Sequence, residues 1–337
     1  MKDQSPSYPL PKKHFLVTGA TGFIGSALVR ALVKTGNRVR ALDDESRGSR
    51  HRLGDLESEI EWMHGDVRDA ATVAQAVTGV DAVCHLAAVN GTEFFYTRPD
   101  LVLEVAVKGM MNVLDACIGQ GVGELFVASS SEVYQTPPEV PTDETVPLSI
   151  PDPLNPRYSY GGGKIISELL TINCGRKNLR RAVIFRPHNV YGPDMGWEHV
   201  IPQFALRMHE LCKRTQGVVT FPIQGAGNET RSFIFIDDMI AGLLKLIEKG
   251  EHLGIYHIGT EDETTIKELA EEVARCFDRK IQIAPGPLKA GGTLRRCPNV
   301  KKIRALGYAP TVSLKQGLAA TVPWYIENAD KKPSRTL

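Results

Sequence analysis

The stretch FLVTGATGFIGSALVRAL, residues 15–32, joins a short apolar run to a glycine-rich turn and then to apolar residues at helical spacing. This order predicts a strand, a turn and a helix. In such a unit Gly19 permits the tight turn, Gly22 lets the backbone approach a phosphate, and Gly25 allows the helix to pack closely on the strand. Unpaired N–H groups at the helix N-terminus favour an anion there. The stretch therefore predicts a site for a dinucleotide pyrophosphate.

A second apolar run, residues 39–42, ends in Asp43, eighteen residues beyond Gly25. An acidic side chain at that place accepts hydrogen bonds from both ribose hydroxyls and repels a 2′-phosphate. The cofactor expected is NAD rather than NADP. Arg40 and Arg47 lie close by in the sequence and leave the choice between the two open.

Composition limits the other classes of function. The chain has 337 residues, a net charge of +1 and mixed charges along its length, so no basic face for nucleic acid or a membrane surface stands out. No run of eighteen apolar residues occurs and the first eleven residues lack an apolar core, so we expect a cytoplasmic protein. The six cysteines are scattered with no C-x-x-C pair, which indicates reduced thiols and no metal site. A small-molecule enzyme is the simplest expectation.

Strands and helices alternate up to about residue 190, which predicts an α/β fold with a Rossmann-like, doubly wound parallel sheet. Cofactor and catalytic groups should gather at the carboxyl ends of the strands. The later part of the chain predicts a smaller C-terminal α/β lobe that binds substrate. The expected divisions are an NAD-binding domain over 12–190, to which segments near 230–260 return, a substrate lobe over 191–328, and flexible tails over 1–11 and 329–337.

Tyr160 and Lys164 lie one helical turn apart, so a phenol and an ammonium share one helix face. A tyrosine with a pKa near 10 is a poor base at neutral pH. A lysine ammonium and a nicotinamide cation close to it favour the phenolate. Tyr160 could then take a proton from a sugar hydroxyl while hydride leaves for NAD.

Several further motifs occur in order along the chain: GDV at 65–67, HLAA at 85–88, SSSEVY at 129–134, RPHNVYGP at 186–193 and TRSF at 230–233. Together with the glycine turn and the Tyr160/Lys164 pair, they resemble the extended short-chain dehydrogenases/reductases that act on nucleotide sugars, the NAD-dependent epimerase/dehydratase group. The resemblance runs from Phe15 to Tyr325.

This resemblance implies roles for individual residues. Ser130 would complete a catalytic triad, with Ser129 and Ser131 as nearby alternatives, and Lys164 would also bind the nicotinamide ribose. Asn189, Arg231 and Arg296 would hold the substrate's diphosphate or sugar, because a guanidinium engages two phosphate oxygens. The full set expected to contact NAD is Gly19, Gly22, Phe23, Ile24, Gly25, Asp43, Asp66, Val67, Leu86, Ala87, Ala88, Tyr160, Lys164 and Pro187. Ser131 is counted with the substrate-binding residues.

Oxidation at carbon 4 of the sugar makes the protons on carbons 3 and 5 acidic, which opens epimerisation, dehydration or, for a uronate, loss of carbon dioxide. Glu132 should point into the site if the strand before it continues, since side chains alternate with period two. Glu198 and His199, beyond the RPHNVYGP motif, are further candidates for the acid/base group. With His188 and Asn189 they favour epimerisation; Ser131, Glu132 and the segment near Pro156 and Arg157 equally resemble UDP-uronate decarboxylases.

Two other classes remain open. A nucleotide-sugar dehydrogenase or ketoreductase would release NADH, and a non-catalytic NAD-sensing protein would not need the Ser130/Tyr160/Lys164 set. Three departures from the family pattern indicate a subgroup with its own substrate: Asn299 replaces an aspartate, Gln135 replaces a glycine, and Ala106 begins a segment that usually starts with asparagine. Gly161, Gly162 and Gly163 are poor helix formers directly after the base. Apolar stripes along 101–118 and 165–172 predict a homodimer.

Overall fold

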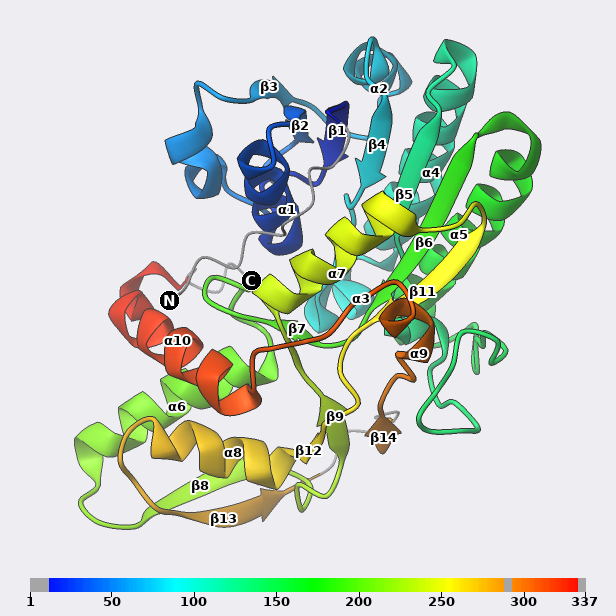
Figure 1. Ribbon diagram of the computed structural model, residues 1–337. Helices are drawn as coiled ribbons and strands as arrows, with labels where there is room; N and C mark the ends of the chain where they lie inside the picture. The colour runs from blue at the N-terminus through cyan, green and yellow to red at the C-terminus, as the bar shows by residue number, and fades with distance from the viewer. Residues whose placement is uncertain (1–11, 288–292, 333–337) are drawn as a thin grey trace.

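The computed structural model describes residues 12–287 and 293–332 and is built around a seven-stranded sheet (Figure 1). The strand order is β11-β6-β5-β4-β1-β2-β3, and each neighbouring pair is parallel. The strands are β1 (His14–Thr18), β2 (Arg38–Asp43), β3 (Glu61–His64), β4 (Ala82–His85), β5 (Glu124–Ala128), β6 (Arg181–Pro187) and β11 (Gly254–Ile258). The doubly wound, Rossmann-like fold expected from the sequence is therefore confirmed.

Helices cover both faces of this sheet, as Figure 1 shows. One face carries α2 (Ala70–Val77), α4 (Pro99–Gln120) and α5 (Ser159–Asn178), and the other carries α1 (Phe23–Lys34) and α7 (Ile236–Lys249). Successive residues of a strand point to opposite faces. In β1, Leu16 accordingly packs in the core under α4, whereas Phe15 and Val17 pack in the core under α1 and α7.

The order in which successive strands are added to the sheet reverses between β1 and β4, which are parallel neighbours in the sheet. Strand order to one side runs through β2 and β3, and to the other through β5 and β6. Ligands of open α/β sheets bind at the carboxyl edge of such a switch point. The ends of β1, β4 and β5 therefore define where the site must be sought.

A second lobe lies below the sheet in Figure 1 and is built from later segments. Its helices are α6 (Val200–Arg214), α8 (Ile266–Arg275) and α10 (Leu314–Glu327), whereas the short helix α9 (Lys301–Arg304) packs against β11 of the large sheet. Its strands are β7 (Val190–Tyr191), β8 (Val219–Gln224), β9 (Thr230–Ser232), β10 (Ile234–Phe235), β12 (Glu263–Thr265), β13 (Ile281–Gly286) and β14 (Arg295–Arg296). The chain does not divide cleanly at residue 190, since α7 and β11 lie with the large sheet.

Short elements complete the chain: α3 (Thr92–Thr97) and the 3-10 turns η1 (Arg50–Leu56), η2 (Ser131–Val133), η3 (Pro156–Tyr158) and η4 (Ala329–Lys331). The tail expected at 1–11 and the end of the tail expected at 329–337 lie outside the described residues. Among the helices of the described ranges, none is long and apolar enough to cross a membrane.

Candidate active site

The glycine turn has the shape that a bound pyrophosphate requires. Gly19 has φ +69°, and a Cβ placed there would lie 2.7 Å from the backbone nitrogen of Ala87. A Cβ on Gly25 would lie 1.9 Å from the Gly19 carbonyl oxygen, so only glycine allows α1 to start this close to β1. Gly22 caps α1 without a side-chain hydrogen bond, which leaves the N–H groups of Phe23 and Ile24 open to an anion.

A cavity follows directly from this turn and runs over the carboxyl ends of β1, β2 and β4. Most of the predicted cofactor residues line it: Gly19, Gly22, Asp43, Asp66, Val67, Leu86, Ala87 and Ala88. The cavity has further lining residues that the sequence did not assign to the cofactor: Leu42, Asp44, Ser46, Arg47, Gly48, Gly65, Val89 and Val105. For all of them except Val105, closeness in the sequence to Asp43, Asp66 or Ala88 is the feature that could have identified them as cofactor residues. These residues fit the adenosine half of a dinucleotide.

Asp43 closes one end of this cavity. Its carboxylate accepts hydrogen bonds from the backbone nitrogens of Thr21 at 2.9 Å and Glu45 at 2.8 Å, and the residue is buried. Two backbone donors hold the carboxylate beside the turn where an adenosine ribose would lie. Asp66 differs, because its carboxylate is engaged by Arg68 at 2.6 Å.

The two arginines that left the NADP alternative open are both engaged elsewhere. Arg40 donates to Glu61 at 2.9 Å and to the carbonyl oxygens of Ala76 and Thr78, both at 2.7 Å. Arg47 donates to the Asn90 carbonyl at 2.8 Å and stacks over Phe94. Neither guanidinium pairs with Asp43, although Arg47 lines the same cavity.

Tyr160 lies in the first turn of α5 and is buried. Its ring stacks on Phe95 with the ring centroids 5.1 Å apart, which fixes the direction of the phenol. Burial raises the pKa of Tyr160 to about 12, while a hydrogen bond with Ser130 acts in the opposite direction. In the free protein the phenol is therefore protonated, and ionisation has to be favoured by added positive charge.

Lys164 lies one turn further along α5. Its Nζ donates to the Ala128 carbonyl at 2.7 Å, at the end of β5, and lies 5.8 Å from the centre of the Tyr160 ring. Burial lowers the pKa of Lys164 to about 8, with Glu168 opposing the shift. The predicted trio of Ser130, Tyr160 and Lys164 is thus brought together at the carboxyl end of β5.

Glu132 reaches the same region by a different route from the one expected. The strand does not continue past Ala128; residues 131–133 form η2, and the Ser130 hydroxyl caps it by accepting the Glu132 N–H at 3.2 Å. The Glu132 carboxylate accepts from Arg296 Nη1 at 2.5 Å. Burial opposes its ionisation, but the charges of Arg296, Arg157 and Arg231 hold its pKa below the usual value.

Arg231 and Arg296 lie side by side as register partners of β9 and β14. Arg231 donates to the carbonyl oxygens of Thr230 at 2.7 Å and Thr293 at 2.8 Å, and burial lowers its pKa to about 10. The Nε atoms of Arg157 and Arg296 and the hydroxyl of Ser159 are buried without a hydrogen-bond partner among the described residues. Such donors, facing one cluster of positive charge, suit an anionic ligand.

The remaining predicted residues are placed less directly. Asn189 is left-handed, with φ +40°, and donates to the Ser232 carbonyl at 2.9 Å. Pro187 is the last residue of β6, and Ser131 is buried in η2. Glu198 and His199 lie close to Arg47. Burial lowers the pKa of His199, and the positive charge of Arg47 lowers it further. Since Arg47 lines the cofactor cavity, both residues lie on that side of the site.

Two departures from the family pattern have local explanations. Asn299 Oδ1 accepts the Lys301 N–H at 3.0 Å in the turn just before α9, and an aspartate carboxylate makes the same contact equally well. Gln135 has φ +53°, the left-handed region that favours glycine, and its Nε2 donates to the Glu132 carbonyl at 2.6 Å. Within the described ranges, no group of three or more His, Cys, Asp or Glu side chains could hold a metal ion.

A phosphate-binding glycine turn, an acidic residue after β2 and a buried Tyr/Lys/Ser set define an NAD-dependent enzyme of the extended short-chain dehydrogenase/reductase class. The chain belongs to the NAD dependent epimerase/dehydratase family, whose model matches residues 15–259. Its cofactor is NAD, and the glycine turn and cavity described above fit that molecule.

Its relatives catalyse different reactions. The chain is 32% identical to UDP-glucuronic acid decarboxylase 2 of Arabidopsis thaliana over 91% of this chain and 67% of that protein. It is 30% identical to GDP-mannose 3,5-epimerase 1 of Oryza sativa subsp. japonica over 97% of this chain and 85% of that protein. A double mutant of the dTDP-glucose 4,6-dehydratase DesIV of Streptomyces venezuelae, solved with NAD bound, superposes with a TM-score of 0.82, 31% identity and coverage of 94% and 98% of the two chains.

Proposed function

We propose that this enzyme acts on a nucleoside-diphosphate sugar through transient oxidation at carbon 4, and that it is an epimerase or dehydratase in which Glu132 removes a proton from carbon 3 or 5. Bound NAD supplies the acceptor for the hydride and the hydride that is returned. Tyr160 takes the proton of the carbon 4 hydroxyl, Ser130 orients that hydroxyl, and Lys164 favours the phenolate.

The observation that carries this proposal is the position of Glu132: its carboxylate accepts from Arg296 Nη1 at 2.5 Å and lies close enough to Tyr160 to raise the pKa of the phenol. The charge of Arg296 keeps the Glu132 carboxylate ionised but also weakens it as a base, and the carboxylate becomes a stronger base when an arriving diphosphate draws Arg296 away. Arg231 and the unpaired donors of Arg157 and Ser159 would bind the same anion. We therefore assign Glu132, rather than Glu198 or His199, as the additional acid/base group.

Decarboxylation of a nucleotide uronate is the second candidate. The cluster of Arg157, Arg231 and Arg296 could hold a sugar carboxylate as well as a diphosphate, and the UDP-glucuronic acid decarboxylases are among the chain's relatives. Loss of carbon dioxide from carbon 5 of a 4-keto uronate requires no base, only a proton donor afterwards.

The test is incubation of the protein with UDP-, GDP-, CDP- and dTDP-sugars, uronates included, in deuterated water, read by mass spectrometry and NMR. The proposal expects deuterium at carbon 3 or 5, and loss of that deuterium in Glu132→Gln. Glu198→Gln and His199→Gln are the matched controls and should retain the exchange. Carbon dioxide release from a uronate would favour the second candidate, whereas net NADH release would replace both with a dehydrogenase.

We also propose that the enzyme is a homodimer joined through α4 and α5. Most of the two apolar stripes is core, but Leu103 and Met111 on α4 and Ile166 and Leu169 on α5 are exposed by 37%, 48%, 40% and 53%. The two helices pack against each other, so these four side chains belong to one surface. An apolar surface shared by adjacent helices is suited to pairing with a second copy.

A further inference from the structure

A buried ion pair lies directly behind the catalytic residues. Arg186 of β6 donates to both carboxylate oxygens of Glu168 of α5, with Nε at 2.8 Å and Nη2 at 2.6 Å. Both side chains are only 2% exposed. A third partner, the Ser129 hydroxyl, also donates to the Glu168 carboxylate.

Such a pair is a poor source of stability by itself, because removing two charges from water offsets most of their attraction. Apolar side chains of similar size would fill the space at least as well. The role of this ion pair is therefore better explained by its position beside the catalytic residues than by a contribution to stability.

Glu168 lies four residues after Lys164 on α5, so both face the end of β5. The two residues at that end are each bonded to α5: Lys164 donates to the Ala128 carbonyl, and Ser129 donates to Glu168. Ser129 is also tied to β6, since its N–H donates to the Phe185 carbonyl at 2.8 Å. Ser130, which orients the substrate hydroxyl, is the next residue.

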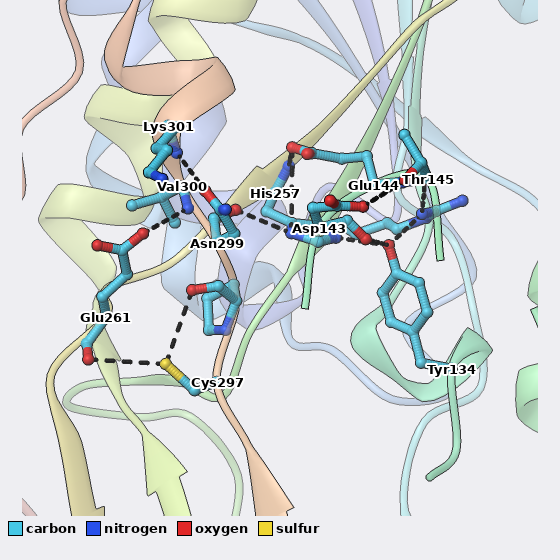
Figure 2. Close-up of polar contacts among 12 residues, drawn as sticks. Tyr134, Asp143, Glu144, Thr145, His257, Glu261, Cys297, Asn299, Val300 and Lys301 are labelled. Carbon is cyan, nitrogen blue, oxygen red and sulfur yellow. Dashed lines mark hydrogen bonds and ion pairs between the residues drawn. The ribbon is translucent and has the colours of Figure 1, made fainter. Parts of the chain in front are cut away.

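Arg186 extends this hydrogen-bond network to the other side of the site. Its Nη1 donates to the Tyr134 hydroxyl, which lies 2.6 Å from His257 Nε2 and donates to the Asp143 carbonyl at 3.1 Å. Figure 2 shows the next contact of this network, in which His257 Nδ1 lies 3.1 Å from the Asn299 carbonyl oxygen. Asn299 belongs to the segment that follows Arg296, the partner of Glu132.

We propose that Glu168 and Arg186 are positioning residues of the active site: paired, they lock the end of β5 onto α5, which places Ser130 and Lys164 around Tyr160. This assignment rests on the proposed function for its catalytic consequences. The carboxylate also lies close enough to Lys164 to favour its ammonium form. The other titratable groups that face Lys164 are Tyr160 on α5 and His85 at the end of β4.

The test compares the double variant Glu168→Gln/Arg186→Met with Glu124→Gln. The double variant removes both charges, so no buried charge is left unpaired. Glu124 provides a control because it is also a buried carboxylate paired with an arginine of β6, Arg181 at 2.8 Å, but it lies at the amino end of β5 and away from the site.

In the double variant we expect kcat to fall about 10- to 100-fold with KM and bound NAD unchanged, as misplacement of catalytic groups produces. The alkaline limb of the pH–rate profile should move to lower pH, because Lys164 loses its proton more readily without the negative charge of Glu168. Glu124→Gln should show neither change, even where it lowers stability. Wild-type kcat and pH profile in the double variant, or the same kcat loss in Glu124→Gln, would overturn the proposal.

One readout does not depend on any substrate. The difference in the pH dependence of unfolding between the NAD-free protein and its Lys164→Met variant reports the Lys164 proton, and in the double-variant background this difference should shift to lower pH. An enzyme inactive on every nucleotide sugar would contradict the proposed function but leave this measurement to decide the role of Glu168. An unshifted pH dependence would contradict the role of Glu168 alone.

Discussion

Burial of Lys164 affects both the chemistry of the site and the stability of the fold. Burial lowers the pKa of its ammonium to about 8, against an ordinary value of 10.5. Between these two values the unfolded chain binds more protons than the folded one, so the free energy of unfolding rises with pH in this window. Below pH 8 both states are protonated and the full cost of burying the charge is present.

The Lys164→Met variant isolates this contribution. Between pH 8 and 10 the NAD-free wild-type protein should gain stability over the variant by on the order of 2 kcal/mol, since each pKa unit corresponds to about 1.4 kcal/mol. Urea unfolding at a series of pH values measures the difference. Lys108→Met, at an exposed lysine on α4, is the control and should show a flat difference. A flat difference for Lys164→Met as well would mean that the buried lysine does not titrate in this range.

Asp43 should decide the choice between NAD and NADP. Its carboxylate is held by Thr21 and Glu45 and faces the ribose position, so Asp43→Asn removes the charge while keeping the size. We expect NAD to bind about 10- to 100-fold more weakly, as loss of charge-assisted hydrogen bonds produces, with a smaller loss for NADP. Titration calorimetry with both cofactors gives the affinity ratio. Arg40→Gln should leave that ratio unchanged because Arg40 is bound to Glu61; an unchanged ratio in Asp43→Asn would remove Asp43 from cofactor selection.

The packing of α5 explains why three glycines follow Tyr160. A Cβ on Gly163 would lie 2.8 Å from the Cβ of Ala106 on α4, and a Cβ on Gly161 would lie 2.9 Å from the Glu132 carbonyl oxygen. A Cβ on Gly162 would meet only Ile150 Cδ1, at an ordinary 3.5 Å. The cost in helix propensity is thus offset by close approach of the protein's own chain at two of the three positions.

Alanine substitutions at neighbouring positions of α5 should therefore have opposite effects. Gly162→Ala should stabilise the protein by about 0.5 to 1 kcal/mol through helix propensity and leave activity unchanged. Gly163→Ala should destabilise it by about 1 to 3 kcal/mol, because α4 and α5 would have to separate. Thermal unfolding of the two variants under identical conditions makes the comparison. Equal effects would show that the close approach to Ala106 does not constrain α5.

The difference between α5 and η2 shows which parts of the site sequence reasoning can reach. Tyr160 and Lys164 could be placed because helical spacing is local and the motif begins the helix. Glu132 was expected on a continuing strand, yet a one-turn helix capped by Ser130 carries it. A serine hydroxyl that competes for a backbone N–H ends a strand without any change in apolar pattern, so periodicity alone does not reveal it.

Long-range pairings were further out of reach. The partner of Glu132 is 164 positions away along the chain, and the Glu168–Arg186 pair joins a helix to a strand. Nothing in the local pattern around these residues indicates a partner, since charged residues in amphipathic segments are usually solvated. The second pair depends on how α5 packs against β6, the strand that follows it in the chain.

For the whole molecule, the alternation of strands and helices predicts a doubly wound parallel sheet, whereas the reversal of strand order between β1 and β4 comes from the structure. The return of α7 and β11 to the large sheet after an excursion into the second lobe was expected only as segments near 230–260. The consequence is functional: the chain crosses between the lobes several times, so Arg231 and Arg296 reach the site from the second lobe while Tyr160 and Glu132 reach it from the first. Substrate that binds both sets would hold the lobes together.

The proposed homodimer can be tested by a single substitution. If the exposed apolar surface of α4 and α5 pairs two copies, a charge introduced at its most exposed member should separate them. Leu169→Glu is expected to reduce the mass of a homodimer to that of a monomer at micromolar concentration, because an unpaired buried carboxylate costs several kcal/mol at an interface. Light scattering coupled to size-exclusion chromatography gives the mass. Leu154→Glu is the control, since Leu154 is 90% exposed but lies outside both helices, and it should leave the mass unchanged. A wild-type protein that is already monomeric would remove the dimer, and a dimeric Leu169→Glu would move the interface to another surface.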